Sequence, residues 1–250
     1  MPSFKITIAY DGGPFVGWQR QAEGTSIQGL IEDALAELDG REVTVVGAGR
    51  TDAGVHAFAQ VAGFALVRDT SPDVVVRSLN ARLPQEIRVR SAEEVPASFH
   101  ARFDATSKRY RYRIWNADVL SPFERAYVWH LPGPLDVAAM ADAARSVEGR
   151  HDFAAFQAVG GAPGPTERVV RLSQISGAEE GLVTYDVEGN GFLRHMVRAI
   201  VGTLVDVGRG RRGAGTMRDV LASRDRSQAG RTAPAQGLFL VRVGYGDRRG

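Results

Sequence analysis

Residues 47–60 read GAGRTDAGVHAFAQ and lie between two strand-like runs, 42–46 and 60–66. They place a single carboxylate, Asp52, close to the cation Arg50 and among three glycines. Glycine lets a backbone approach a ligand closely or adopt positive φ angles that other residues resist. A lone acid on such a loop, beside an arginine, is expected to stay ionised and exposed, as a nucleophilic or base-acting carboxylate requires.

Asp52 and His56, both in this loop, can also be interpreted as structural residues. An aspartate before Ala-Gly is most often a turn or helix-cap residue, but here a cation, a hydroxyl, a carboxylate and an imidazole cluster within seven residues. His56 is one of five histidines, and none forms a ligand pair at metal spacing. We therefore predict no metal site and interpret His56 as hydrogen-bonding support for the loop.

The composition is that of an ordinary globular protein of 250 residues, enough for one large domain or two small ones. No stretch approaches 18 consecutive apolar residues, and the chain starts directly with a strand pattern rather than a secretory signal. Cysteine is absent, which excludes disulfides, thiolate catalysis and cysteine-based metal sites. A cytoplasmic location is expected.

The positive charge is carried almost entirely by arginine. Lys5 and Lys108 are the only lysines, so 29 of the 31 basic residues are arginine, although the formal net charge is only +2. Arginine suits bidentate phosphate contacts and stacking on bases. A GC-rich genome would produce the same excess, so composition alone does not identify a partner.

Strand and helix patterns alternate along the chain. An amphipathic helix follows a Thr25–Gln28 capping box and ends at Gly40. Further helices are predicted at 71–81, 135–147, 192–207 and 217–222, with strands at 4–10, 87–89, 108–115, 169–175, 182–187 and 238–243.

This order predicts an α+β fold of two related lobes, each a mainly antiparallel sheet flanked by helices. We place the boundary so that the lobes are 1–105 and 106–250 and the ligand lies in the cleft between them.

Residues 107–113 alternate aromatic and basic side chains. On a strand Tyr110 and Tyr112 share one face, and the three arginines share the other. A nucleic-acid-binding sheet has this pattern, since rings stack on bases and cations hold phosphates. An ordinary strand with a buried aromatic face has it as well.

Two arginines stand four residues apart in the most apolar helix pattern. Arg194 and Arg198 would share a face of that helix, where a buried guanidinium needs a carboxylate partner, and Asp52 is a candidate. A pair of solvated surface arginines is the alternative. No phosphate-binding P-loop, dinucleotide fingerprint or G-x-S-x-G elbow is present, so no nucleotide cofactor is expected.

Five motifs in order closely resemble the TruA family of tRNA pseudouridine synthases. They are AYDGGPFVGWQRQ (9–21), GAGRTDAGVHAFAQV (47–61), FHARFDATSKRYRYRIWN (99–116), GNGFLRHMVRAIVGTLVDVG (189–208) and TAPAQGLFLVRV (232–243). The resemblance implies the pseudouridine synthase fold and isomerisation of uridine to pseudouridine at positions 38 to 40 of the tRNA anticodon stem-loop. It also implies a homodimer that needs no cofactor.

The resemblance further implies roles for five residues. Asp52 matches the catalytic aspartate, and Arg50 matches the arginine that helps to flip the target base. Tyr110 matches the ring that packs on the uracil, and Arg198 matches the arginine paired with the catalytic carboxylate. Leu238 matches an apolar residue that lines the pocket.

Three positions depart from the family pattern, and none is a proposed site residue: Ala199, Arg231 and Phe239 stand where Asn, Pro and Tyr are common. Two other functions stay open. One is a non-catalytic protein that binds structured RNA on the same scaffold. The other is a glycosidase-like hydrolase, which would need a second carboxylate that the motif around Asp52 lacks.

Overall fold

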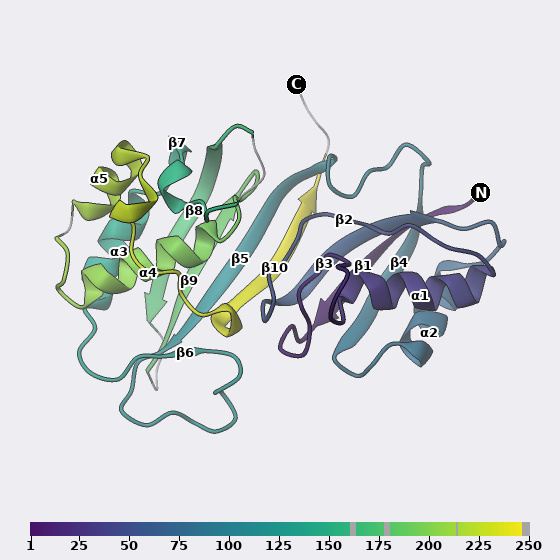
Figure 1. The fold of residues 1–250 in the computed structure, drawn as a ribbon, viewed down its shortest axis with the longest axis horizontal. Coiled ribbons are helices and arrows are strands. Elements are labelled where there is room, and N and C mark those ends of the chain that lie inside the picture. Colours follow the sequence, from purple (N-terminus) through teal and green to yellow (C-terminus); the bar gives the residue numbers. More distant parts are fainter. Residues whose placement is uncertain (161–163, 178–180, 214, 247–250) are drawn as a thin grey trace. The chain divides into compact units, whose positions relative to one another are not determined.

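The structure is a computed structural model that describes residues 1–160, 164–177, 181–213 and 215–246 (Figure 1). Ten strands and five α-helices form within these residues, and most strand pairs are antiparallel, so the predicted α+β class is confirmed. The chain divides into two compact units: Met1–Thr106 together with the segment from Phe239 onward, and Ser107–Leu238. Within the described residues no helix is long and apolar enough to cross a membrane.

The first unit is built around β3 (His56–Ala65), which pairs antiparallel with β1 (Ser3–Tyr10). Along β1 every second side chain is buried, as the alternating sequence predicts. The other strands are β2 (Val46–Gly47) and β4 (Ile87–Val95), both antiparallel, and β10 (Leu238–Tyr245), which is parallel to β3.

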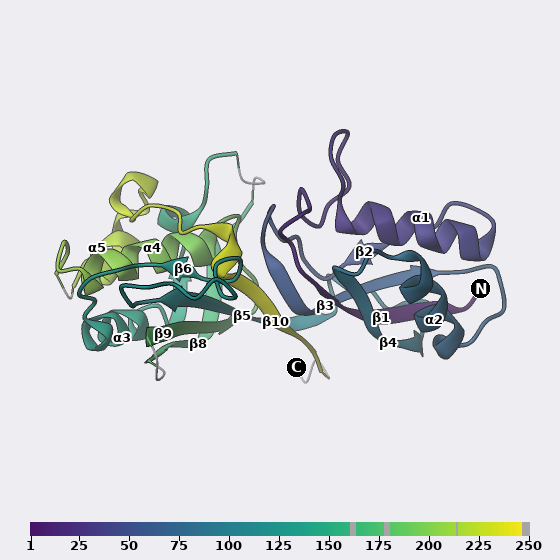
Figure 2. The ribbon, with the colours of Figure 1, turned by 90° about the horizontal axis from the view of Figure 1, so that it is seen from below.

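Two helices, α1 (Ile27–Asp39) and α2 (Pro72–Arg82), lie on one face of the strands of this unit (Figure 2). The sequence boundary assigned everything after residue 105 to the second lobe. In the structure β10 instead joins the first unit, because Phe239 pairs with His56 of β3.

The second unit has an antiparallel row of strands with helices packed against it. Its helices are α3 (Val137–Arg145), α4 (Met196–Gly208) and α5 (Thr216–Ser223). The row runs β5 (Ala105–Trp115), β9 (Leu182–Gly189), β8 (Glu167–Gly177), β7 (Gly149–Asp152), and the short β6 (Trp129–His130) is parallel to β5. Strands β6 and β7 are too short to leave a periodic pattern, so the sequence did not predict them.

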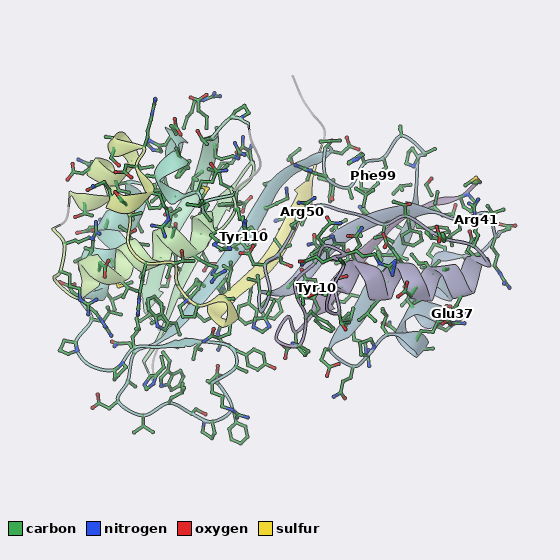
Figure 3. All side chains as sticks on the ribbon, in the orientation of Figure 1. Tyr10, Glu37, Arg41, Arg50, Phe99 and Tyr110 are labelled. Carbon is green, nitrogen blue, oxygen red and sulfur yellow. The ribbon has the colours of Figure 1, made fainter. Side chains whose placement is uncertain are left out.

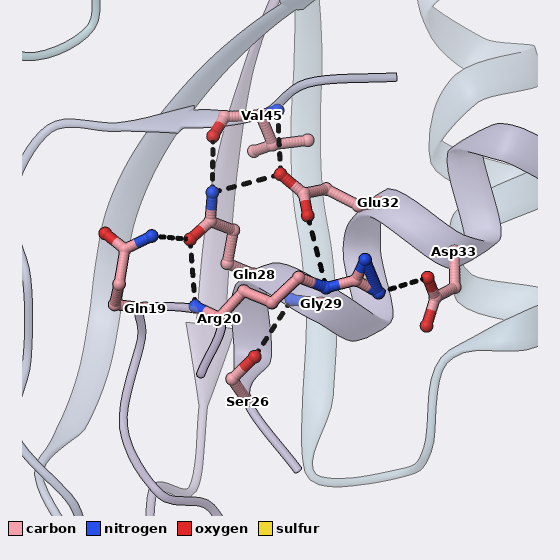
Figure 4. Close-up of polar contacts among 8 residues, drawn as sticks. All are labelled: Gln19, Arg20, Ser26, Gln28, Gly29, Glu32, Asp33 and Val45. Carbon is pink, nitrogen blue, oxygen red and sulfur yellow. Dashed lines mark hydrogen bonds and ion pairs between the residues drawn. The ribbon is translucent and has the colours of Figure 1, made fainter. Parts of the chain in front are cut away.

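The start of α1 differs from the predicted capping box by one residue. Ser26 is the N-cap, and its hydroxyl accepts a hydrogen bond from the Gly29 N–H at 3.2 Å. The Gln28 side chain donates to the Val45 carbonyl at 2.9 Å and accepts from the Arg20 N–H at 3.0 Å (Figure 4). Gln28 therefore ties the loop before α1 to the chain that enters β2, instead of capping the helix.

The start of α4 corrects a second prediction. The helix begins at Met196 rather than near residue 192, because its N-cap His195 has a left-handed conformation with φ 61°. Arg194 precedes the helix and donates to the Gly160 carbonyl at 3.3 Å. The prediction that Arg194 and Arg198 share a helix face is therefore wrong.

Candidate functional site

The Asp52 loop is held through its backbone by the glycine-rich loop that follows β1. Gly17 and Asp52 form an isolated antiparallel bridge, and the Trp18 N–H donates to the Thr51 carbonyl at 3.0 Å. The Asp52 carbonyl accepts from the Val55 N–H at 3.1 Å across a turn. These contacts fix the backbone on both sides of the Asp52 side chain.

Close approach between these two loops requires glycine. A Cβ on Gly12 would lie 2.0 Å from the Val55 carbonyl oxygen, far inside any normal contact. A Cβ on Gly47 would lie 2.5 Å from Nε1 of Trp18, whose indole is almost fully buried. Gly47 therefore admits a protein side chain, and not the ligand that the sequence suggested.

Three consecutive residues of this loop differ in their exposure to solvent. Arg50 is exposed, Thr51 is buried and Asp52 is half-buried. Asp52 and Arg50 thus lie together on one fixed loop of the first unit (Figure 3 labels Arg50). Tyr110, Arg198 and Leu238 belong to the second unit, so the pairing of Arg198 with Asp52 stays a prediction.

His56 is a buried residue at the start of β3, with a side chain only 2% exposed. Its ring stacks on Phe239 with centroids 4.7 Å apart. Nδ1 lies 3.0 Å from both the Gly12 N–H and an Asp11 oxygen, but one nitrogen cannot accept from the first and donate to the second. The Gly12 backbone N–H can only donate, so we assign Nδ1 as its acceptor. This arrangement supports the structural interpretation of His56.

Tyr110 and Tyr112 lie on the buried face of β5. Tyr110 meets the edge of Phe192 at 5.1 Å, and its label in Figure 3 lies over this strand. The Tyr112 hydroxyl donates to the Pro234 carbonyl at 2.8 Å. Burial raises the pKa of Tyr112, against the opposing effect of the Arg198 and Arg231 charges. Tyr112 is therefore a core residue.

The arginines on the opposite face of β5 have acidic partners within the same unit. Arg111 binds Asp186, its cross-strand neighbour on β9, through nitrogen–oxygen distances of 3.1 to 3.2 Å. Arg109 also approaches Asp186, and Arg113 pairs with Glu124 at 2.8 Å. For this face the ordinary-strand interpretation holds, and phosphate binding gains no support.

Arg198 is anchored in the first turn of α4. Its Nε donates to the Ala233 carbonyl at 2.7 Å, while the Ala233 N–H donates to the Arg198 carbonyl at 3.0 Å. These two hydrogen bonds tie the first turn of α4 to the segment around Ala233. A backbone carbonyl acceptor leaves no signal in the sequence, so Ala233 was not predicted.

Leu238 is buried at the start of β10, directly after a 3₁₀ turn at Ala235–Gly237. A Cβ on Gly237 would lie 2.6 Å from the Tyr112 ring, so this turn packs tightly against β5. Leu238 is thus positioned by contacts within the second unit.

Among the described residues, neither the cavity near α1 nor a metal-binding cluster involves any of the candidate site residues. A cavity of about 470 Å³ near the start of α1 is lined by no candidate residue, and its Arg20 is ion-paired with Glu32 and Asp33. Across the described ranges, no group of three or more histidine, aspartate or glutamate side chains is placed to hold a metal ion.

Known proteins match nearly the whole chain. A family model described as tRNA pseudouridine synthase matches residues 6–104 and 143–246. Proteins named tRNA pseudouridine synthase A are 48% identical in Solibacter usitatus (98% of this chain, 100% of the relative) and 46% identical in Myxococcus xanthus (99% and 93%). The relative of that name in Moorella thermoacetica is 47% identical, with 98% of this chain and 100% of the relative covered. The chain therefore belongs to the tRNA pseudouridine synthase family.

Proposed function

We propose that Asp52 is the catalytic carboxylate with which this chain converts uridine to pseudouridine at positions 38 to 40 of the tRNA anticodon stem-loop. Membership of the family makes the chain an isomerase that acts on tRNA. The observation that carries the assignment of Asp52 is the loop itself, in which Gly17 pairs with Asp52 and the N–H groups of Trp18 and Val55 bind the carbonyls of Thr51 and Asp52.

The chemistry fits a single carboxylate. The N1–C1′ bond of the nucleoside breaks, the base turns, and a C5–C1′ bond forms to the same sugar. The C5 proton is lost and N1 gains one, so the product is an isomer and no electrons are transferred. An ionised Asp52 would either attack the substrate or remove a proton to give a glycal-like intermediate. Neither route requires a cofactor.

Four further residues complete the proposed site. Because the target base must leave the helix stack, Arg50 is proposed to assist its flipping and Tyr110 to pack on the uracil. Arg198 would pair with the Asp52 carboxylate, and Leu238 would line the pocket. Support for two of these residues comes from the contacts that hold their side chains: Tyr110 packs against Phe192, and Arg198 donates to the Ala233 carbonyl. A cytoplasmic homodimer is part of this proposal.

Asp52→Asn tests the proposal, because it removes the charge with little change in shape. The readout is tritium release from tRNA labelled at C5 of uridine, with tRNA binding measured separately. We expect release to be lost and binding to be retained within about twofold. Asp69→Asn, an exposed aspartate on another loop of the same unit, is the control and should remain active.

The same assay separates the other functions. Binding of tRNA without tritium release by the wild-type protein would favour the non-catalytic RNA-binding protein. Free uracil among the products would favour a hydrolase. Full activity of Asp52→Asn would refute the role of Asp52.

A further inference from the structure

A buried chain of three polar side chains lies behind the Asp52 loop. The Tyr10 hydroxyl, at the end of β1, is 2.8 Å from the Thr51 hydroxyl. The Gln60 amide donates to the Gly49 carbonyl at 3.0 Å and lies 3.5 Å from the Tyr10 hydroxyl. All three side chains are at most 6% exposed.

The groups involved fix the direction of one of these hydrogen bonds. The Gln60 amide nitrogen can only donate, so the Tyr10 hydroxyl accepts from it, whereas either oxygen of the Tyr10–Thr51 pair can be the donor. Burial raises the pKa of Tyr10 to about 12, although its bonds to Thr51 and Gln60 lower it in part. The hydroxyl therefore stays protonated at neutral pH, and the hydrogen bond between the two hydroxyls is kept.

These hydrogen bonds hold the loop at the residues before and after Arg50. Gln60 holds the Gly49 carbonyl, and Tyr10 holds the side chain of Thr51. The Thr51 carbonyl is bound in addition by the Trp18 N–H. Adjacent Cα atoms are about 3.8 Å apart, so fixing Thr51 also fixes the Cα of Asp52.

We propose that Tyr10, Thr51 and Gln60 are positioning residues for the isomerisation and set where the Asp52 carboxylate meets the nucleoside. None of the three touches the reacting atoms in this account. The inference rests on the proposed role of Asp52. Sequence reasoning did not find Tyr10 or Gln60, since they lie 41 residues before and 9 residues after Thr51.

The main test is the kinetics of Tyr10→Phe, with Tyr185→Phe as a matched control. Tyr185 is fully buried in the second unit, and its hydroxyl bonds the Ser173 hydroxyl at 2.9 Å. Both variants lose one buried hydroxyl–hydroxyl bond and should lose similar thermal stability. Only Tyr10→Phe should lower kcat, by roughly 10- to 100-fold with KM for tRNA within about twofold, because a displacement near 1 Å carries a cost of this size.

A second pair of variants tests the hydroxyl of Thr51 itself. Thr51→Val removes the hydroxyl at nearly constant shape and should reproduce the loss in kcat. Thr51→Ser keeps the hydroxyl and should restore turnover to within about threefold of wild type. A merely structural role would give no such rescue of kcat.

Asp52→Asn, assayed in parallel, distinguishes the two ways of failing. If Asp52→Asn is inactive while Tyr10→Phe turns over as fast as Tyr185→Phe, the positioning role is overturned and the role of Asp52 stands. If Asp52→Asn is fully active, the proposed function fails, and positioning through Asp52 fails with it.

Discussion

Replacing Gly12 by alanine would push a methyl group into the backbone that supports Asp52. The new Cβ would lie 2.0 Å from the Val55 carbonyl oxygen, and contacts below 3.0 Å are essentially never tolerated. The two loops must therefore separate by at least about 1 Å. Because the obstacle is backbone rather than a flexible side chain, rotamer changes cannot relieve it.

Two effects of Gly12→Ala are expected. Overpacking of this kind costs roughly 1 to 3 kcal/mol, which for a protein of this size lowers Tm by about 2 to 4 °C per kcal/mol. A displacement of about 1 Å beside the carboxylate should also lower kcat by on the order of 10²-fold. Calorimetry and single-turnover assays at a temperature well below Tm measure the two effects separately.

Gly13→Ala is the adjacent control. Its Cβ would meet only the Asp11 side-chain oxygen, at 3.2 Å, which requires a shift of a few tenths of an ångström. Activity near wild type is expected for this variant. If Gly12→Ala were as active and as stable as Gly13→Ala, the inferred close packing of the two loops would be refuted.

Two further predictions concern charge. Steady-state kinetics should show that Arg198→Met lowers turnover far more than Arg194→Met. Arg198→Lys should not restore turnover fully, because lysine lacks the guanidinium fork. Equal losses of turnover in the two Met variants would remove the reason for choosing Arg198. Since the folded-state pKa of Tyr10 lies near 12, above its unfolded value of 10.0, the hydroxyl stabilises the fold below pH 10. That contribution, ~3 kcal/mol, is lost as pH rises to 12. The free energy of unfolding, measured by urea denaturation at pH 9 and at pH 11.5, should therefore fall less for Tyr10→Phe than for wild type. Equal decreases in the two proteins would contradict this prediction.

Local features of the fold were predictable from the sequence. The alternating burial of β1 and the end of α1 at Gly40, which has φ 76°, follow from side-chain pattern and backbone preference. Ser71 and Pro72 likewise predicted the start of α2. Each signal lies within the element that it describes.

Features that depend on distant partners were not predictable. The alternation on β5 fits an RNA-binding face and a core strand equally well, and only the position of Asp186 on β9 decides that Arg111 is ion-paired. The parallel pairing of β10 with β3 likewise depends on residues far apart in the sequence.

The candidate site also has residues that the sequence identifies and residues that only the structure identifies. The motif around Asp52 identifies the carboxylate and its neighbour Arg50 from sequence alone. The residues that fix them, Trp18 and Tyr10, come from a separate motif and act through backbone or long-range bonds. Sequence reasoning offered ligand approach or a positive φ angle as the role of the loop glycines; in the structure Gly47 makes room for Trp18, and Gly54 has φ 75°.

The most direct test of the central claim is a map of pseudouridine in unmodified tRNA after incubation with this protein. Chemical labelling of pseudouridine followed by primer extension locates each modified position. We predict new signals confined to positions 38 to 40 with the wild-type protein and none with Asp52→Asn. Pseudouridine only at other positions, or an unchanged map with Asp52→Asn, would contradict the account.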